Sequence, residues 1–184
     1  MKKYILLGAF IASLLIGACS PYTDEEPGGT AVQDLCGTWV VTPFASVGEY
    51  IGNLDLSLMT KTELDAVDDW AYAGDMFALR TYNTANNDKD SLWFDDGFWH
   101  EKFKIHCDYG KLAFGSENDS VDAISADGCK ALIRFGQVIK GAVTTPRGQK
   151  ADSIIAYVFY NDDEDGLTYK FSGYRYTGYS EDLE

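Results

Sequence analysis

Apolar and polar residues alternate with period two through most of the chain from Leu35 onward, and no other feature constrains the fold as strongly. The clearest run is Trp99–Tyr109, where one face carries Trp99, Phe103, Ile105, Cys107 and Tyr109 and the other face is charged. Successive side chains of a strand point to opposite faces, so one face of this strand is buried and the other is wet. No segment keeps an apolar stripe at helical spacing for a full helix length. The pattern therefore predicts an all-β protein.

Further strands are predicted at 37–42, 75–84, 90–95, 131–143, 152–160 and 167–175. Residues 152–160 are apolar on both faces, which indicates a central strand or one that lines an apolar cavity. The segment Thr62–Val67 could form one short helix. Eight or more antiparallel strands must close into a barrel or pack as two sheets, because open edges invite aggregation. We favour an antiparallel barrel of about eight or more strands.

The first 18 residues have the order of a secretory signal peptide: Lys2 and Lys3, then an apolar run, then small residues. The run is shorter than the roughly 20 residues that a transmembrane helix needs. Residues Ile16-Gly17-Ala18-Cys19 resemble a bacterial lipobox, and this resemblance implies cleavage before Cys19 and lipidation of that cysteine. An ordinary signal peptide with a coincidental cysteine is the alternative. Several acyl chains would hold the protein on a membrane stably.

Residues 19–34 are predicted to be the lipidated cysteine followed by a flexible acidic tether, and residues 35–184 a single barrel domain. The 184-residue chain has a formal net charge of −14. Removal of residues 1–18 leaves 13 basic against 29 acidic residues, a net charge of −16. Such a charge repels nucleic acid, so nucleic acid is not an expected partner. The acidic stretch after Cys19 also resembles the surface-export signal of Bacteroides-type lipoproteins, although a merely solvated linker explains it equally well.

Several segments, in order along the domain, resemble a family of Bacteroides-type envelope proteins described as lipid-binding putative hydrolases, whose fold is a lipocalin-like (calycin) barrel. These segments are Gly37-Thr38-Trp39, Tyr82–Ala85, Leu92–Asp96, Asp152-Ser153-Ile154 and Gly173–Gly178 with Glu181-Asp182. The resemblance implies a lipocalin-like barrel. It does not decide between an enzyme and a binding protein, and it carries over no catalytic residue.

In lipocalin-like barrels a tryptophan on the first strand packs under a basic residue of the last strand and closes one end. Trp39 and Arg175 fit these roles as a structural plug, worth about 0.5–2 kcal/mol as a cation–π pair. A barrel of about eight strands can also enclose one small ligand. We predict an apolar ligand-lining set of six residues: Tyr82, Trp93, Phe135, Ile155, Tyr157 and Phe159.

Catalytic chemistry is poorly represented in the sequence. The chain has no Gly-x-Ser-x-Gly elbow, and its two histidines, His100 and His106, are about 20 Å apart if they share one strand. Ser91 and Ser153 each follow an aspartate, but neighbours on a strand point apart and cannot form a catalytic pair. Catalytic residues and cofactors are therefore predicted as none, and enzyme activity is left uncertain with a preference for none.

Metal binding is not expected either. The acidic segment Asn161–Gly166 has no glutamate at the twelfth position of a calcium loop, so a hairpin turn is favoured. Cys36, Cys107 and Cys129 form no zinc-ligand spacing, and buried thiols or one disulfide are favoured with the pairing open.

Three functions are compatible with the sequence. The first is a lipid-anchored protein of the cell envelope, at the outer membrane or cell surface, that binds a small lipid-like or apolar ligand inside the barrel. The second is a hydrolase on the same scaffold. The third is a surface accessory or adhesin-type lipoprotein whose barrel is filled with side chains.

Overall fold

The structure is a computed structural model that describes residues 29–46, 66, 70–99, 102–115, 123–124 and 130–183. It contains ten strands: β1 (Gly37–Ser46), β2 (Trp70–Tyr72), β3 (Phe77–Asn83), β4 (Ser91–Asp95), β5 (Lys102–Asp108), β6 (Ala113–Gly115), β7 (Ala123–Ile124), β8 (Lys130–Thr144), β9 (Lys150–Tyr160) and β10 (Thr168–Arg175). Three short 3-10 helices accompany them: η1 (Gln33–Leu35), η3 (Tyr109–Lys111) and η5 (Ser180–Leu183). The helix predicted at 62–67 lies, apart from Ala66, outside the described residues.

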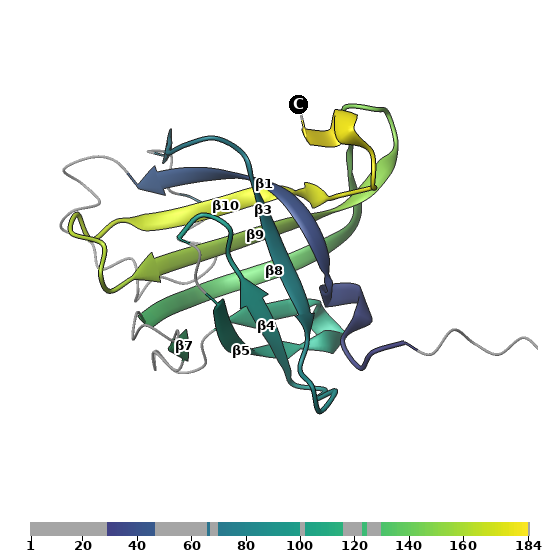
Figure 1. Ribbon diagram of the computed structural model, residues 1–184, viewed down its shortest axis with the longest axis horizontal. Helices are drawn as coiled ribbons and strands as arrows, with labels where there is room; N and C mark the ends of the chain where they lie inside the picture. The colour runs from purple at the N-terminus through teal and green to yellow at the C-terminus, as the bar shows by residue number, and fades with distance from the viewer. Residues whose placement is uncertain are drawn as a thin grey trace, which may run out of the picture.

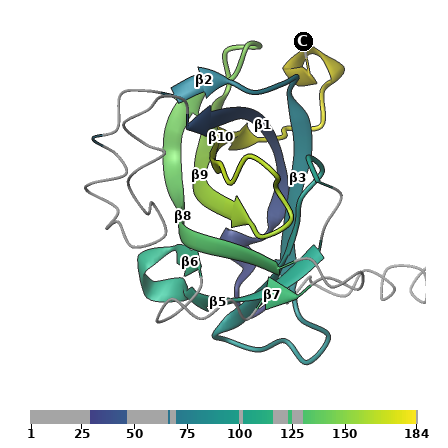
Figure 2. The ribbon, with the colours of Figure 1, turned by 90° about the vertical axis from the view of Figure 1, so that its left-hand side faces the viewer.

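Eight antiparallel strands close into a ring in the order β1-β10-β9-β8-β6-β5-β4-β3 and back to β1. Figure 2 looks along this ring from the end where β1 finishes. The two remaining strands lie beside it: β2 pairs with β1 and β7 pairs with β8. The predicted all-β antiparallel barrel is confirmed. The pairing of β10 with β1 closes the ring and leaves no open edge in it, so the ring offers no free strand edge for aggregation.

The inward faces of the strands form one apolar core. Strand β5 shows the alternation most clearly, with Phe103, Ile105 and Cys107 buried and the residues between them exposed. Residues that pair across neighbouring strands point to the same side of the sheet. Phe94 of β4 therefore points inward with Phe103 of β5, and Val158 of β9 points inward with Ile133 of β8. The side chains interlock closely, because a Cβ at Gly136 would overlap the ring of Phe114.

The strand predicted at Trp99–Tyr109 is shorter than the sequence pattern indicates. It begins at Lys102 and ends at Asp108. Trp99 belongs to the preceding connection, where its backbone N–H donates to the Asp96 carboxylate at 2.6 Å. At the other end, the Asp108 carboxylate accepts a hydrogen bond from the Lys111 N–H at 3.2 Å, which caps η3. At each end of the predicted strand, an aspartate side chain thus accepts hydrogen bonds from nearby backbone N–H groups that would otherwise be available for strand pairing.

The N-terminal segment closes one end of the barrel. Val32 and Leu35 are fully buried in the core, so the packed chain begins a few residues before the predicted boundary at Leu35. Figure 1 shows this segment and η1 at one end of the barrel, while β1 finishes and β10 begins at the other end. We call these the Arg175 end and the aromatic end after the residues described next.

Candidate functional site

The Arg175 end is organised by one guanidinium. Its central carbon lies 4.3 Å from the centroid of the Trp39 ring, and the two residues are cross-strand partners on β10 and β1. Arg175 also donates to the backbone carbonyls of Cys36 and, at 2.9 Å, of Asp34. The buried Trp39 indole N–H donates to Thr81 at 2.8 Å. The structure thus brings together the two residues of the predicted plug, and the N-terminal segment is fastened to them.

Two aspartates extend this network. Asp152 accepts hydrogen bonds from Arg175 Nε at 3.2 Å, Lys140 Nζ at 3.0 Å and the Gly141 N–H at 2.9 Å. Asp34 accepts from Lys140 Nζ at 2.9 Å and from the Tyr109 hydroxyl at 2.8 Å. Hydrogen bonds from Lys140 and Tyr109 lower the pKa of Asp34. Partial burial alone would raise the pKa of Asp152, but the hydrogen bonds from Gly141 and Lys140 and the nearby positive charges lower it overall.

Six aromatic side chains meet inside the aromatic end and form what we call the end cluster: Phe77, Phe98, Trp99, Tyr160, Tyr169 and Phe171. Trp99 stacks on Tyr160 with ring centroids 5.2 Å apart and an interplanar angle of 10°. It also lies 5.4 Å from Tyr169, while Phe98 lies 5.3 Å from Tyr169. Four of the six rings come from strands, and Phe98 and Trp99 come from the β4–β5 connection.

One buried carboxylate holds that connection against the cluster. Asp96 is 1% exposed and accepts hydrogen bonds from the backbone N–H groups of Phe98 and Trp99 at 2.8 and 2.6 Å and from the Tyr160 hydroxyl at 2.6 Å. Gly97 fits between them because a Cβ there would overlap the Ala78 carbonyl oxygen of β3. The aromatic end is therefore an apolar lining with a few fixed polar groups.

The six predicted ligand-lining residues are placed differently. Tyr82 pairs with Trp93, and Trp93 pairs in turn with the exposed Lys104, while their neighbours Thr81 and Phe94 face the core. On β8 and β9 the core residues point inward, and the residues that alternate with them point outward. The outward set includes Phe135, Ile155, Tyr157 and Phe159. All six therefore lie on the outer face of the barrel, and a ligand in the interior would not touch them.

An apolar outer face explains why β9 is apolar on both sides. Tyr157 is 1% exposed although it points away from the barrel interior, and its ring lies 5.7 Å from that of Trp70 on β2. Lys170 Nζ lies over the Trp70 ring at 5.0 Å. The period-two pattern shows that both faces of β9 are apolar, but it does not show which face points into the barrel. The same pattern does not predict the end cluster, because Phe98 and Trp99 lie in a connection and not in a strand.

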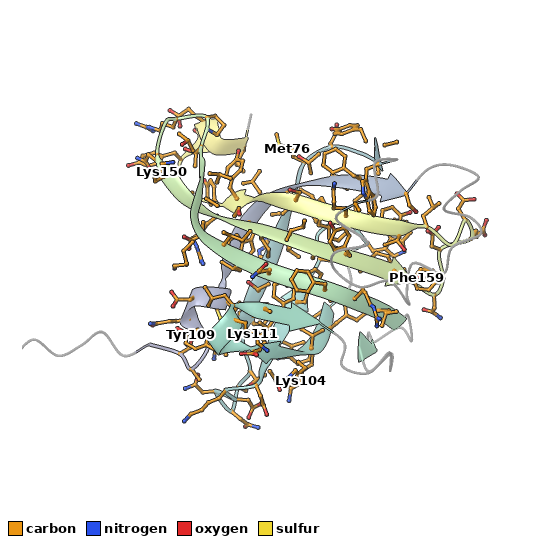
Figure 3. All side chains as sticks on the ribbon, turned by 180° about the vertical axis from the view of Figure 1, so that it is seen from behind. Met76, Lys104, Tyr109, Lys111, Lys150 and Phe159 are labelled. Carbon is orange, nitrogen blue, oxygen red and sulfur yellow. The ribbon has the colours of Figure 1, made fainter. Side chains whose placement is uncertain are left out.

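A cavity of about 250 Å³ lies on the barrel wall where β5, β6 and β8 meet. Its lining includes His106 and Asp108 of β5, Lys111 of η3, Phe114 and Gly115 of β6, and Arg134 of β8. This cavity is remote in the fold from the aromatic end: Figure 3 shows Lys111 beside Tyr109, and Phe159 at the opposite end of the barrel. None of the predicted ligand-lining residues contributes to it.

The described residues hold no arrangement of a catalytic triad or a metal centre. His106 is exposed on the outer face of β5, and His100 lies outside the described residues. Ser91 Oγ does donate to Asp90 at 3.1 Å, contrary to the expectation for strand neighbours, because Asp90 precedes the first residue of β4. No group of three or more His, Cys, Asp or Glu side chains in the described ranges could hold a metal ion.

The acidic turn is held by ordinary hydrogen bonds, and the two described cysteines form no disulfide. In the turn before β10, the Asp163 carboxylate accepts from the N–H groups of Asp165 and Leu167 and from the Tyr169 hydroxyl. Cys36 and Cys107 are free thiols, and Cys129 lies outside the described residues. Burial, together with the charges of nearby acids and Cys36, raises the pKa of Cys107 to about 11, so this thiol is neutral and unreactive at neutral pH.

The fold and its two ends define the class of protein: a closed antiparallel barrel, plugged at one end by Arg175 over Trp39 and lined with aromatic rings at the other. The family model described as "lipid-binding putative hydrolase" matches residues 24–180, and the chain belongs to this family. The resemblance seen in the sequence is confirmed. No curated protein matches the chain significantly. Among the described residues, no helix has the length and apolar character needed to cross a bilayer.

Proposed function

We propose that this protein is a lipid-anchored protein of the cell envelope that binds a small lipid-like or apolar ligand at the aromatic end of its barrel. Membership of a lipid-binding family supports the ligand class. The signal-like residues 1–18 and the lipobox-like sequence that ends at Cys19 support the anchor and the location. Cys19 would carry the acyl chains, and the barrel would carry the ligand.

The end cluster is the observation that carries the ligand assignment. Ligand sites are mostly apolar and aromatic, with a few convergent polar groups, and the aromatic end combines six rings with Asp96 and two tyrosine hydroxyls. Phe98 and Trp99 belong to a connection held in place by two backbone hydrogen bonds to Asp96, whereas the other rings are fixed in the closed ring of strands. An apolar ligand would take the place of these two side chains against Tyr160 and Tyr169.

A matched pair of tryptophan variants tests this site. Residues 20–184, which contain every described residue, would be purified and examined by native mass spectrometry, before and after solvent extraction, and then titrated with a panel of fatty acids. We expect a lipid mass that extraction removes. Because the ligand takes the place of the Trp99 side chain, we expect Trp99→Ala to raise fatty-acid affinity at least fivefold. Trp93→Ala is the control, because Trp93 lies on the outer face of β4.

The alternatives give different results. If Trp93→Ala alters affinity and Trp99→Ala does not, the ligand binds the outer face, where the six predicted lining residues lie. Bare protein that takes up no fatty acid would contradict the proposal and favour the accessory or adhesin-type protein with a filled barrel.

A further inference from the structure

Among the described rings of the end cluster, Trp99 and Tyr160 form the one parallel pair. Their planes meet at 10°, whereas the other ring pairs of the cluster meet at angles between 32° and 80°. Phe98 also lies against Trp99, with ring centroids 5.1 Å apart. Tyr169 borders the stack, 5.4 Å from Trp99 and 6.0 Å from Tyr160. The indole of Trp99 therefore occupies a flat slot, and the ring of Tyr160 is one wall of it.

This wall is fixed in the barrel. Tyr160 is fully buried, and its hydroxyl donates to Asp96 at 2.6 Å. The fully buried Phe103 of β5 packs beside it in the core, with ring centroids 6.3 Å apart. Tyr160 is also the last residue of β9 and pairs with Ala131 of β8, so its backbone is part of the ring of strands. The flat face of Tyr160 would therefore stay in place if Trp99 moved away from it.

Trp99, in contrast, is not held by strand pairing. It is half-buried in the β4–β5 connection, between Asp95 at the end of β4 and Lys102 at the start of β5. Its backbone N–H donates to Asp96 at 2.6 Å, so the connection can keep its position while the indole rotates about the side-chain bonds. Such a rotation uncovers the face of Tyr160 and breaks no hydrogen bond between strands.

The slot suits a planar, uncharged group. Stacked rings attract each other beyond the apolar area that they bury, and a rigid ring loses less conformational freedom on binding than an alkyl chain does. The hydroxyls of Tyr160 and Tyr169 already donate to Asp96 and Asp163, so neither proton is available to an anionic head group. The slot therefore offers ring faces rather than hydrogen-bond donors.

We propose that the ligand of the aromatic end carries an uncharged planar ring of about the size of an indole, and that this ring replaces Trp99 on the face of Tyr160. Trp99 acts as an internal substitute for the ligand and covers Tyr160 in the unliganded protein. This inference rests on the function proposed above, because it names the chemical class of the ligand for the same site.

Two probes test the shape of the ligand. 2-Naphthol is a flat bicyclic ring, and decanol is a flexible chain with the same number of carbon atoms and one hydroxyl. Residues 20–184 would be titrated with each probe and followed through the backbone amide NMR signals of Phe98 and Trp99. We expect saturable shifts with 2-naphthol and a dissociation constant at least tenfold lower than that of decanol. Decanol has the larger apolar surface, so burial of apolar area alone would give the opposite order.

Variants connect this preference to the stack. Tyr160→Leu keeps an apolar side chain but removes the flat face, and it should abolish the preference for 2-naphthol over decanol. Tyr160→Phe keeps the ring and loses only the hydroxyl, so it should retain the preference. If Tyr160→Leu does not fold, Trp99→Ala replaces it, because uncovering Tyr160 should raise the affinity for 2-naphthol more than that for decanol. Trp93→Ala, on the outer face of β4, is the control and should change neither affinity.

The outcomes separate this inference from the proposed function. Equal or tighter binding of decanol, with shifts at Phe98 and Trp99, would overturn the planar ligand and leave the aromatic end as a lipid site. A preference for 2-naphthol that persists in folded Tyr160→Leu, or equal gains for both probes in Trp99→Ala, would also overturn it. No saturable shift with either probe would contradict both the planar ligand and a ligand site at the aromatic end.

Discussion

At the scale of single residues, Arg175 connects several separate segments of the chain at its end of the barrel. Its guanidinium contacts the Trp39 ring, the backbone carbonyls of the N-terminal segment and the Asp152 carboxylate on β9. Each of these groups comes from a different part of the chain. Since Asp34 and Cys36 precede β1, the plug also determines where the N-terminal segment docks.

Arg175→Ala should therefore destabilise the domain. Loss of the cation–π contact and of hydrogen bonds to a charged donor should lower the free energy of unfolding by about 2–4 kcal/mol. Urea denaturation measures this, and ligand affinity of the folded fraction should not change. Arg147→Ala is the control, because Arg147 stacks on Tyr179 and pairs with Glu181 at the exposed surface, where such contacts contribute about 1 kcal/mol or less. A fully stable Arg175→Ala variant would contradict the structural role.

The same network makes stability depend on pH. The pKa values of Asp34 and Asp152 are both lowered in the folded protein, so each carboxylate stabilises the fold above its unfolded pKa of about 4. This stabilisation is lost as the pH falls below about 4 through the lowered folded pKa values. Chemical denaturation between pH 3 and pH 7 should show a decline at the acid end that Asp152→Asn makes shallower. Asp75→Asn, at an exposed site, is the control variant.

At the scale of elements, the sequence was sufficient for most strands and for closure of the ring. The buried face of β5 could be predicted from the sequence, because its outer face is charged and only one face is apolar. Strand β9 carries apolar residues on both faces, and only its pairing with β8 and β10 shows that Ile154 and Val158 point inward. The predicted ligand-lining residues of β9 point to the outer face instead. Neither the end cluster nor the cavity could be predicted, because each depends on a loop or a bulge that brings distant residues together.

Pairing of β1 with β10 closes the ring, and this pairing depends on one glycine. A Cβ at Gly173 would overlap the backbone carbonyl oxygen of Val40 and lie 2.7 Å from the Val41 Cα. Backbone atoms cannot move aside as the end of a flexible side chain can, so Gly173→Ala should cost about 1–3 kcal/mol or more of unfolding free energy. Thermal and urea unfolding measure the loss. Gly110→Ala is the matched control, because a Cβ there would make only an ordinary 3.4 Å contact with Asp108; equal stability of the two variants would contradict this reading of the seam.

At the scale of the whole molecule, the described chain begins at one end of the barrel and the proposed ligand site lies at the other. The chain enters the barrel at the Arg175 end, where the Ala31 N–H donates to Asn87 at 2.7 Å and Val32 is buried. Ten residues from Cys19 to Gly28 precede the described part of the chain, a reach of at most about 35 Å when extended. If Cys19 is lipidated, the plugged end is the one joined directly to the membrane. The aromatic end would then exchange its ligand at a distance from the point of attachment.

The anchor itself is the element on which this arrangement depends, and Cys19→Ser tests it. Several acyl chains at about 0.8 kcal/mol per buried methylene hold a protein on a bilayer, whereas an acidic domain without them is repelled by anionic lipid. The wild-type chain, expressed in a bacterium that lipidates such cysteines, should partition into the detergent phase and incorporate labelled fatty acid. Cys19→Ser should lose the label and leave the detergent phase. Cys36→Ser is the control, because Cys36 lies between η1 and β1 in the described barrel and should not affect labelling. Label that persists in Cys19→Ser would place the modification elsewhere and contradict attachment through the segment that precedes the Arg175 end.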